Sequence, residues 1–394
     1  MSSQLYKRIR DELKIHVDPA VSETTRERLA LLVMGILESE SSKPSQIARA
    51  IRRLGLSEAK AESLERRVRR IENDPAITAS LCFHPFARAH LRIGKPEQLI
   101  LAIDPTTQDE RVVMVTIGVW YRGRALPLAW AVWPANQKLK GPGFWERVAA
   151  LLAEVADLLP PGVPVIWLAD RAFGTPQFTD LLVPYGWHFV VRVQGQTRCR
   201  DVQGRECTIR SLVHRKGQRA KLAGNAFKKR GWRAVSVVVY WGRRHTSPLC
   251  LVTDLPPDWS VIYHYRQRYS LEAMFRDYKS HGWHWEANQV RDIDHIQRLL
   301  VGMAFATWFA LLTGIQVAAE LLAQPITPRR SLPWAARRSL FTLGLHRLQD
   351  WLHGACSHPL GPWFLFHWQS RNWRDELYFR HSRAFVFHSQ QNCA

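Results

Sequence analysis

The sequence predicts an α/β protein in which a β-rich insertion interrupts the α/β core, with mainly helical regions at both ends. Apolar residues with helical spacing dominate the N-terminal part, short apolar runs bounded by turn residues follow, and helical patterns return near residue 258. A chain of 394 residues is long enough for two or three domains with a full hydrophobic core. We expect five segments: N-terminal helices over 1–90, the first part of the α/β core over 91–185, the insertion over 186–257, the second part of the core over 258–325, and C-terminal helices over 326–394.

Two short helical patterns in the N-terminal segment stand beside many arginines. Apolar residues recur with helical spacing on both sides of Gly55, at Ile47, Ile51 and Leu54 and then at Leu64, Val68 and Ile71. Ser57 is the expected N-cap of the second helix. The neighbouring arginines are Arg49, Arg52, Arg53, Arg66, Arg67, Arg69 and Arg70. The pair predicts either a helix-turn-helix that contacts DNA or a helical hairpin with a solvated basic face.

The charge balance indicates a polyanionic partner. Lys and Arg number 55 against 34 Asp and Glu, which gives a formal net charge of +21 and a pI near 10.3. Each phosphate that a cation neutralises releases condensed counterions, so this excess favours nucleic acid. The 17 Trp residues add surfaces on which bases can stack.

Cysteine spacing and apolar segments argue against several other classes of protein. The six cysteines contain no Cys-x2-Cys pair, which disfavours a zinc finger or a disulfide framework. The first twenty residues lack the apolar core of a signal peptide, so we expect a cytoplasmic protein. Residues 299–319 are long enough to cross a membrane. Because this stretch stands alone and contains Thr307, Thr313 and Gln316, we expect a buried helix and no membrane contact.

Two predicted strands end on an aspartate. The run "QLILAID" ends at Asp104, and "VPVIWLAD" ends at Asp170. Between them lie two predicted strands joined by a tight turn and then one helix, at 112–121, 125–133 and 144–159. Catalytic groups often gather at the carboxyl ends of strands in α/β sheets, although Asp is also common in turns. The pattern therefore leaves open a shared site or two unrelated turn residues.

The predicted insertion is rich in β-strand patterns. Apolar runs that read as strands occupy 188–193, 233–241 and 248–255. Residues 214–233 form a basic stretch with three glycines, which predicts a hairpin or loop. The length of the whole segment predicts a separate lobe rather than a simple connection.

The stretch "YRQRYSLEAMFRDYK" at 265–279 carries mixed charges on one helical face. With Tyr265 at zero and about 100° per residue, Arg268 falls at ~300°, Glu272 at ~340° and Lys279 at ~320°. These four side chains share a stripe about 60° wide. The stripe indicates either a surface ion pair between Arg268 and Glu272 or a site in a groove.

Asp104, Asp170 and Glu272 could form one site if the fold brings them together. Three neighbouring carboxylates repel one another unless a cation neutralises them. Oxygen ligands suit Mg²⁺ or Mn²⁺, and two such ions about 3.5–4 Å apart support phosphoryl transfer. Nearby Tyr265 and basic side chains would then hold the flanking phosphates.

The pattern Tyr265-x2-Arg268-x3-Glu272-x6-Lys279 is similar to the signature of a large group of bacterial insertion-sequence transposases of the DDE class. "LAID" at Asp104 and "LADRAFG" at Asp170 resemble the first and second acid motifs of that group. The resemblance runs from about residue 25 to 320. It implies a ribonuclease H-like core, a mixed five-stranded sheet with flanking helices, whose third acid lies on a helix after an inserted β lobe.

The resemblance also implies roles and partners. Asp104, Asp170 and Glu272 would be the catalytic acids that hold two Mg²⁺ or Mn²⁺ ions, and Tyr265, Arg268, Lys279 and Arg171 would contact phosphates at the transposon end. The expected reaction is nicking at the element's end, followed by attack of the freed 3′-hydroxyl on target DNA. A homodimer would pair two inverted-repeat ends in a synaptic complex at the bacterial nucleoid.

The sequence departs from some relatives at one position and leaves alternatives open. Those relatives place a Trp in the last strand of the insertion, where it holds a flipped base during hairpin formation. The corresponding place here is near Leu249, and Trp241 lies one strand earlier, so it is open whether the reaction includes a hairpin step.

Two alternatives to a transposase are a metal-dependent nuclease of the same fold that cuts without joining, and a catalytically silent DNA-binding descendant. The last 65 or so residues match no motif, and dimer contacts or DNA binding are both open for them.

Overall fold

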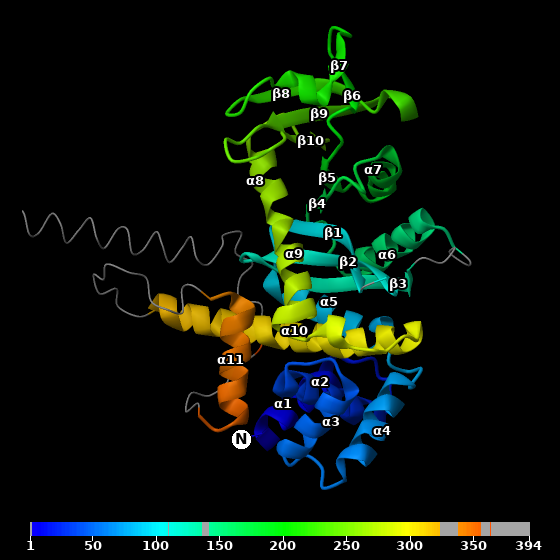
Figure 1. The fold of residues 1–394 in the computed structure, drawn as a ribbon, viewed down its shortest axis with the longest axis vertical. Helices are drawn as coiled ribbons and strands as arrows, with labels where there is room; N and C mark the ends of the chain where they lie inside the picture. The colour runs from blue at the N-terminus through cyan, green and yellow to red at the C-terminus, as the bar shows by residue number, and fades with distance from the viewer. Residues whose placement is uncertain (1, 109, 136–141, 324–337, 356–362, 364–394) are drawn as a thin grey trace, which may run out of the picture.

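The structure is a computed structural model that describes residues 2–108, 110–135, 142–323, 338–355 and 363. Its strands form one sheet of ten in the order β3-β2-β1-β4-β5-β10-β9-β8-β6-β7 (Figure 1). They are β1 Leu99–Gln108, β2 Val112–Tyr121, β3 Arg124–Pro134, β4 Val165–Ala169, β5 His188–Arg192, β6 Arg198–Asp201, β7 Glu206–Thr208, β8 Arg219–Ala226, β9 Arg233–Tyr240 and β10 Leu249–Thr253.

Helices surround the first half of this sheet and make up both ends of the described chain. The α-helices are α1 Ser2–His16, α2 Glu23–Ser39, α3 Pro44–Arg53, α4 Ala61–Glu72, α5 His84–Gly94, α6 Phe144–Leu158, α7 Pro176–Leu182, α8 Ser260–Gln267, α9 Tyr269–Arg276, α10 Ile293–Ala323 and α11 Leu340–Leu352. Short 3-10 turns are η2 Val183–Tyr185, η3 Ile209–Leu212, η4 Lys228–Arg230 and η6 Trp285–Ala287, and π-helical turns are η1 Ala79–Phe83 and η5 Asp277–His281.

The first half of the sheet is mixed, as the family resemblance implies. β1, β2 and β3 form an antiparallel meander, whereas β4 and β5 run parallel to β1. The β2–β3 turn consists of Arg122 and Gly123, both with positive φ (50° and 91°), which is the backbone twist that favours two-residue hairpin turns. The helical stripe predicted over 144–159 forms α6, which connects β3 to β4.

The prediction that a strand ends at Asp104 is wrong, because β1 continues for four more residues to Gln108. This extension pairs only with β2, up to Gln108↔Val112, since β4 stops earlier. The second acid follows the prediction, as Asp170 comes directly after the last residue of β4. Pairing with β2 in the hairpin extends β1 beyond its apolar run, and the run itself does not reveal this pairing.

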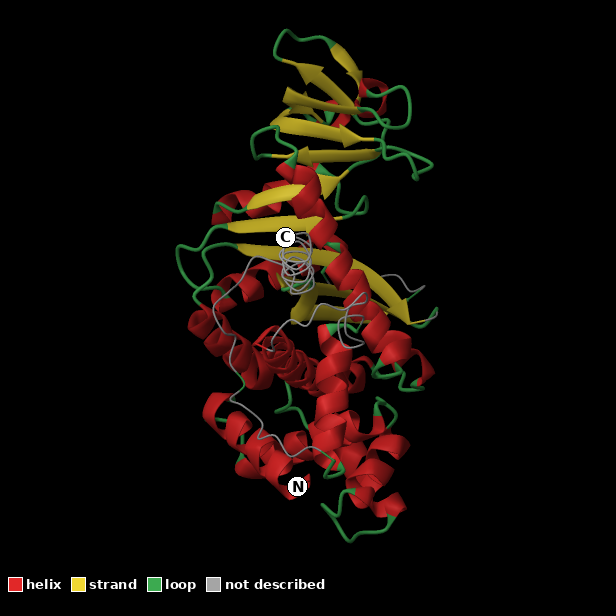
Figure 2. Ribbon diagram, turned by 90° about the vertical axis from the view of Figure 1, so that its left-hand side faces the viewer, coloured by secondary structure: helices red, strands yellow, loops and turns green. Residues whose placement is uncertain are grey.

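The insertion is β-rich as predicted, but its strands do not form a separate sheet. β10 pairs with β5 and with β9, so the inserted strands continue the sheet of the core (Figure 2). The basic stretch 214–233 contains β8, which pairs with β9 along its whole length. Hydrogen bonding along the open edge of β5 therefore ties the insertion to the core, and segment length alone gave no sign of this.

The N-terminal region is helical, and α3 and α4 pack against each other around Gly55, whose φ is +67°. The expected N-cap at Ser57 is wrong: α4 begins later, after Lys60, and the Ser57 hydroxyl accepts a hydrogen bond from Ala59 N instead. Three extra residues of turn separate the helices, so the serine closes a local turn rather than a helix.

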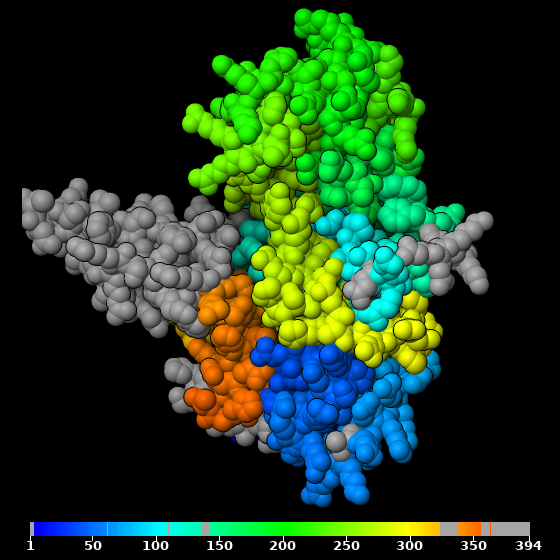
Figure 3. All heavy atoms as spheres, in the orientation of Figure 1, coloured from blue at the N-terminus to red at the C-terminus, as the bar shows by residue number. Residues whose placement is uncertain are grey.

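Residues 265–279 do not form the single regular helix that their spacing suggests. α8 ends at Gln267 and α9 begins at Tyr269, with Arg268 at the junction, and a π-helical turn starts at Asp277. The segment still runs in one line across the sheet and reaches the surface on the face shown in Figure 3. Lys279 lies in the wider turn, so its position cannot be taken from a constant 100° per residue.

The helix α10 lies between the sheet and the N-terminal helices (Figure 1) and packs against β3, α2, α4 and α11. Trp308 on α10 donates from its indole N–H to Pro127 O on β3 at 2.9 Å. Among the described helices, α10 is the one long and apolar enough to cross a membrane, and 94% of its most apolar window is buried. The expectation of a buried helix is confirmed. In the C-terminal region α11 is helical as expected, and most of 326–394 lies outside the described residues.

Candidate active site

Asp104 and Asp170 lie on neighbouring parallel strands at the same level of the sheet. The register of β1 and β4 ends with the pair Ile103↔Ala169, and the two acids are the next residue on each strand. Neighbouring strands are about 4.8 Å apart, so the two backbones pass side by side here. Asp104 and Asp170 therefore lie next to each other in the sheet, although β4 ends just before Asp170 and β1 continues past Asp104.

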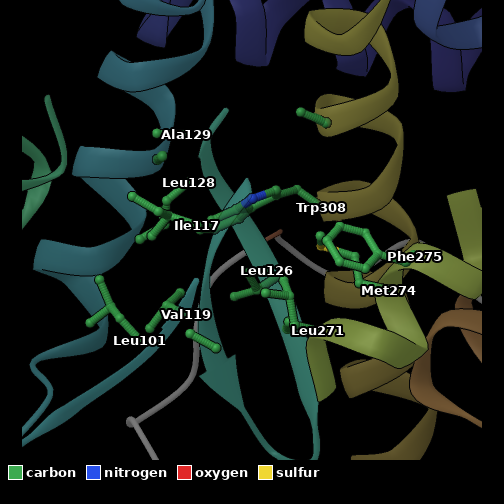
Figure 4. Packing of buried hydrophobic residues seen from close by; sticks show 14 of the residues in the cluster. Leu101, Ile117, Val119, Leu126, Leu128, Ala129, Leu271, Met274, Phe275 and Trp308 are labelled. Carbon is green, nitrogen blue, oxygen red and sulfur yellow. The ribbon is translucent and has the colours of Figure 1, made fainter. Parts of the chain in front are cut away.

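The third acid, Glu272, reaches the same region from α9. Leu271, Met274 and Phe275 point from α9 into the core, toward residues of β2, β3 and α10 (Figure 4). Gly118 on β2 lets the helix approach, because a Cβ at this position would lie 3.0 Å from Leu271 Cδ1. With these apolar side chains fixing the rotation of α9, the side chain of Glu272 stays 46% exposed.

Arg268 lies between two of the three acids. Its Nη1 donates to Asp104 Oδ2 at 2.9 Å, and its Nη2 donates to Glu272 Oε1. The Arg268 side chain is only 6% exposed, so this is a buried guanidinium bridge rather than the solvated i, i+4 surface pair that the sequence left open.

The surroundings of Asp104 alter its ionisation. Burial raises the pKa of Asp104 to about 7; the Arg268 guanidinium opposes this change, while the charges of Asp170 and Glu272 add to it. The charges of Asp170 and Glu272 therefore both act on the Asp104 carboxyl in the folded chain. Asp170 is also held by its own loop, because its Oδ1 accepts a hydrogen bond from Ala172 N at 2.7 Å.

The acids do not form a ready-made metal cluster. Within the described part of the chain, no three Asp, Glu, His or Cys side chains are placed together so that they could hold a metal ion. The donor chemistry nevertheless fits a hard divalent cation, since the acids offer only carboxylate oxygens and their mutual repulsion calls for a positive partner. In this conformation the guanidinium of Arg268 supplies that positive charge.

The other residues of the 265–279 stretch occupy different environments. Tyr265 is buried, and its hydroxyl has no hydrogen-bond partner; burial raises its pKa. The guanidinium carbon of Arg268 lies 5.6 Å from the centre of the Tyr265 ring. Lys279 pairs with Glu286 at 3.4 Å and is 25% exposed. The structure thus groups Arg268 with Glu272 and Tyr265, while Lys279 has a partner of its own.

A basic cavity of about 280 Å³ opens beside the second acid, between the loop after β4 and the insertion. Its cations are Arg171, Arg198, Lys228, Lys229 and Arg230. Arg171 follows Asp170 directly and is exposed. Only Arg171 of these five was predicted from the sequence. The run Lys228-Lys229-Arg230 in the basic stretch was the available signal, but its position near β4 depends on how the insertion folds.

A second cavity of about 520 Å³ lies between the insertion and α8. Tyr240, Tyr265 and Tyr269 line it together with Arg192 and Arg266. Leu249 also borders this cavity, and Tyr240 is its partner across the β9–β10 pair. Trp241 is half-buried just outside β9, where its indole N–H donates to His245 O at 3.1 Å.

The arginines predicted to bind DNA are on the surface of α3 and α4. Arg49, Arg52, Arg66 and Arg67 are exposed, and the ion pairs identified in the described residues do not involve them. Arg53 is also exposed but pairs with the buried Glu38 at 3.2 Å. The two helices lie at the end of the molecule opposite the inserted strands (Figure 1).

Residues 145–309 match the family model of the transposase DDE domain. This match supports the interpretation of the chain as a DDE-class transposase. The matched residues include Asp170 and Glu272 and begin after Asp104.

No protein of curated function matches the chain. Among solved structures, the catalytic domain of human endonuclease V is 14% identical, covering 55% of this chain and 90% of its own, with a TM-score of 0.26. Another structure of human endonuclease V is 15% identical, covers 71% of this chain and 99% of its own, and has a TM-score of 0.25. TM-scores this low do not define a shared fold.

Proposed function

We propose that this protein is a DNA transposase that binds the terminal inverted repeats of its own mobile element and catalyses phosphodiester hydrolysis and strand transfer. The observation that carries the proposal is the buried guanidinium of Arg268 bridging Asp104 and Glu272, with Asp170 directly after the strand next to that of Asp104, in a chain whose residues 145–309 match the transposase DDE domain. The excess of Lys and Arg, a formal net charge of +21, supports a DNA substrate.

The core strands support a ribonuclease H-like arrangement. The order β3-β2-β1-β4-β5, with an antiparallel meander followed by two parallel strands, agrees with the mixed five-stranded sheet that the family resemblance implies. In this proposal the first acid lies on the central strand, the second follows its parallel neighbour, and the third comes from the helix after the insertion.

Asp104, Asp170 and Glu272 would hold two Mg²⁺ or Mn²⁺ ions, which when bound polarise the phosphate and activate an attacking oxygen. The chain itself would orient the DNA strand. Hydrolysis breaks one P–O bond and leaves a 3′-hydroxyl, and that hydroxyl then displaces the leaving oxygen of a phosphodiester in target DNA. A hairpin formed between hydrolysis and strand transfer is an alternative route within the same scheme.

Basic and aromatic side chains around the acids would position the phosphates. We assign Arg171 and the basic cavity to the strand that passes Asp170, because five cations face one opening there. Tyr265, Arg268 and Lys279 would hold phosphates next to the scissile bond. Arg49, Arg52, Arg53, Arg66 and Arg67 would contact the transposon end. A homodimer would pair two such ends at the nucleoid.

The test is a cleavage assay with purified full-length protein, Mn²⁺ and a duplex that carries the element's end. Glu272→Gln removes one carboxylate with little change in volume, so we expect DNA binding to persist while cleavage falls below detection. Glu97→Gln changes an exposed acid just before β1 and is the matched control, which should cleave like the wild type. Cleavage by Glu272→Gln at the wild-type rate would contradict the assignment.

The same gel separates the transposase from the alternatives. Joined products support strand transfer, and nicked products without joining indicate a nuclease of the same fold. A wild-type protein that binds the duplex but leaves it intact would favour the silent DNA-binding descendant.

A further inference from the structure

Both terminal nitrogens of Arg268 are bonded to acids in this structure, which conflicts with a role as a ready phosphate contact. Nη1 bonds to Asp104 and Nη2 to Glu272, while Nε is buried without a hydrogen-bond partner. The side chain is 6% exposed. No part of the guanidinium is therefore presented to a DNA strand.

The oxygens that Arg268 uses are ones that a divalent cation would need. Arg268 takes Oδ2 of Asp104 and Oε1 of Glu272, the acids that lie on β1 and α9. A guanidinium cannot lose its proton in a protein, so it can leave these oxygens only by moving. Arginine and metal are therefore competitors for the same carboxylates.

A partly exposed aromatic ring, Tyr269, lies beside the guanidinium of Arg268. The guanidinium carbon lies 5.3 Å from the centre of the Tyr269 ring, and this residue is 50% exposed. The buried Tyr265 ring lies on the core side at 5.6 Å. A rotation toward solvent would keep the cation near an aromatic face while it leaves the acids.

We propose that Arg268 is an internal counter-ion that closes the acid site in the metal-free protein and is released when a DNA phosphate offers it another partner. This inference rests on the proposed function, because it takes Asp104 and Glu272 as metal ligands. Release of Arg268 would link the two events, so that DNA strengthens metal binding and metal strengthens DNA binding by the same factor. The site would then hold its metal weakly until DNA arrives.

The test measures Mn²⁺ binding to the full chain without DNA, by the electron paramagnetic resonance signal of free Mn²⁺. Arg268→Gln removes the competing charge, and we expect Mn²⁺ to bind roughly 5- to 150-fold more tightly than to the wild type, the usual range of such couplings. Arg266→Gln is the matched control, because it removes the same charge from an exposed position on α8. It should stay close to the wild type.

Arg268→Lys guards against a variant that fails to fold. Lysine keeps the charge but lacks the planar fork that bridges two carboxylates. The Mn²⁺ affinity of Arg268→Lys should therefore lie between that of the wild type and that of Arg268→Gln. Thermal unfolding of each variant checks that it is folded. Equal Mn²⁺ affinity in folded wild type, Arg268→Gln and Arg268→Lys would overturn the counter-ion role.

Glu272→Gln in the same titration separates this inference from the proposed function. If Glu272→Gln abolishes Mn²⁺ binding and Arg268→Gln matches the wild type, only the counter-ion role fails. If Glu272→Gln leaves Mn²⁺ binding unchanged in every background, the metal site itself fails and both proposals are overturned.

Discussion

Asp104 and Glu72 are buried acids whose ionisation depends on this fold. Asp104 keeps a guanidinium beside it, but Glu72 at the end of α4 is 2% exposed, and its Oε1 has no hydrogen-bond partner. Burial raises the pKa of Glu72 from 4.5 to about 7, opposed by Arg69 and assisted by Glu65. Folding therefore favours the protonated form of this side chain.

This perturbation predicts a pH-dependent stability that Glu72→Gln removes. Because the folded pKa lies above the unfolded value, the stability from Glu72 is fully present below pH 4.5 and is lost as the pH rises through about 7. The free energy of unfolding of the wild type, relative to Glu72→Gln, should fall across this window in urea titrations. Glu62→Gln, exposed on the same helix, should run parallel to the wild type. Parallel curves for Glu72→Gln would contradict the prediction.

At the scale of elements, the contact between α10 and α11 depends on two glycines. A Cβ on Gly314 would collide with Leu340 O, and a Cβ on Gly344 would collide with Ala310 O. The two helix backbones therefore touch directly. This contact anchors α11 on the core, next to the helix that also supports β3 and the N-terminal helices.

The glycine contact predicts an unusual sign for a Gly→Ala change. In a helix such a change ordinarily stabilises by about 0.4–1 kcal/mol, because it restricts the unfolded chain. At Gly344 the new methyl group meets backbone, so we expect Gly344→Ala to destabilise by about 1–3 kcal/mol in denaturant unfolding. Gly302→Ala on α10 meets mainly the movable side chain of Leu32 and should cost less. A Gly344→Ala protein as stable as the wild type would refute the tight contact.

On the scale of the whole molecule, the N-terminal helices are part of one packed body. α2 and α4 pack on α10, and Leu32 and Ile36 lie within 3.2 Å of a Cβ built on Gly302. Deleting residues 1–80 would therefore uncover the apolar surface of α10 along with any DNA contacts. Point changes on the exposed arginines test DNA recognition without this damage.

The basic face of α3 and α4 predicts a change in salt dependence. Arg66→Gln with Arg67→Gln should weaken DNA binding and flatten the slope of log K against log salt by about 0.9 for each phosphate that the variant no longer neutralises. Lys7→Gln with Lys14→Gln removes the same charge from exposed positions on α1 and is the control. The measurement is the DNA-binding constant of each double variant at several salt concentrations from low to moderate. Equal slopes for both double variants would remove α4 from the DNA contact surface.

Local patterns were enough to predict several features of the fold. Short β-branched runs bounded by turn residues predicted β2, β4, β9 and β10, and a stripe of apolar residues predicted α6. The end of β4 just before Asp170 followed from the end of its apolar run. Features that depend on pairing with a distant strand were missed. The extension of β1 past Asp104 and the union of the insertion with the core are of this kind.

The sequence by itself determined the charge, much of the secondary structure and the four-residue spacing that lets Arg268 contact Glu272. Only the tertiary structure placed Asp104, 164 residues earlier, on the other side of the same guanidinium. It also decided that one guanidinium bridges Asp104 and Glu272. The reason is that the rotation of α9 on the sheet is set by Leu271, Met274 and Phe275 packing against distant segments, and spacing along the chain does not specify such contacts.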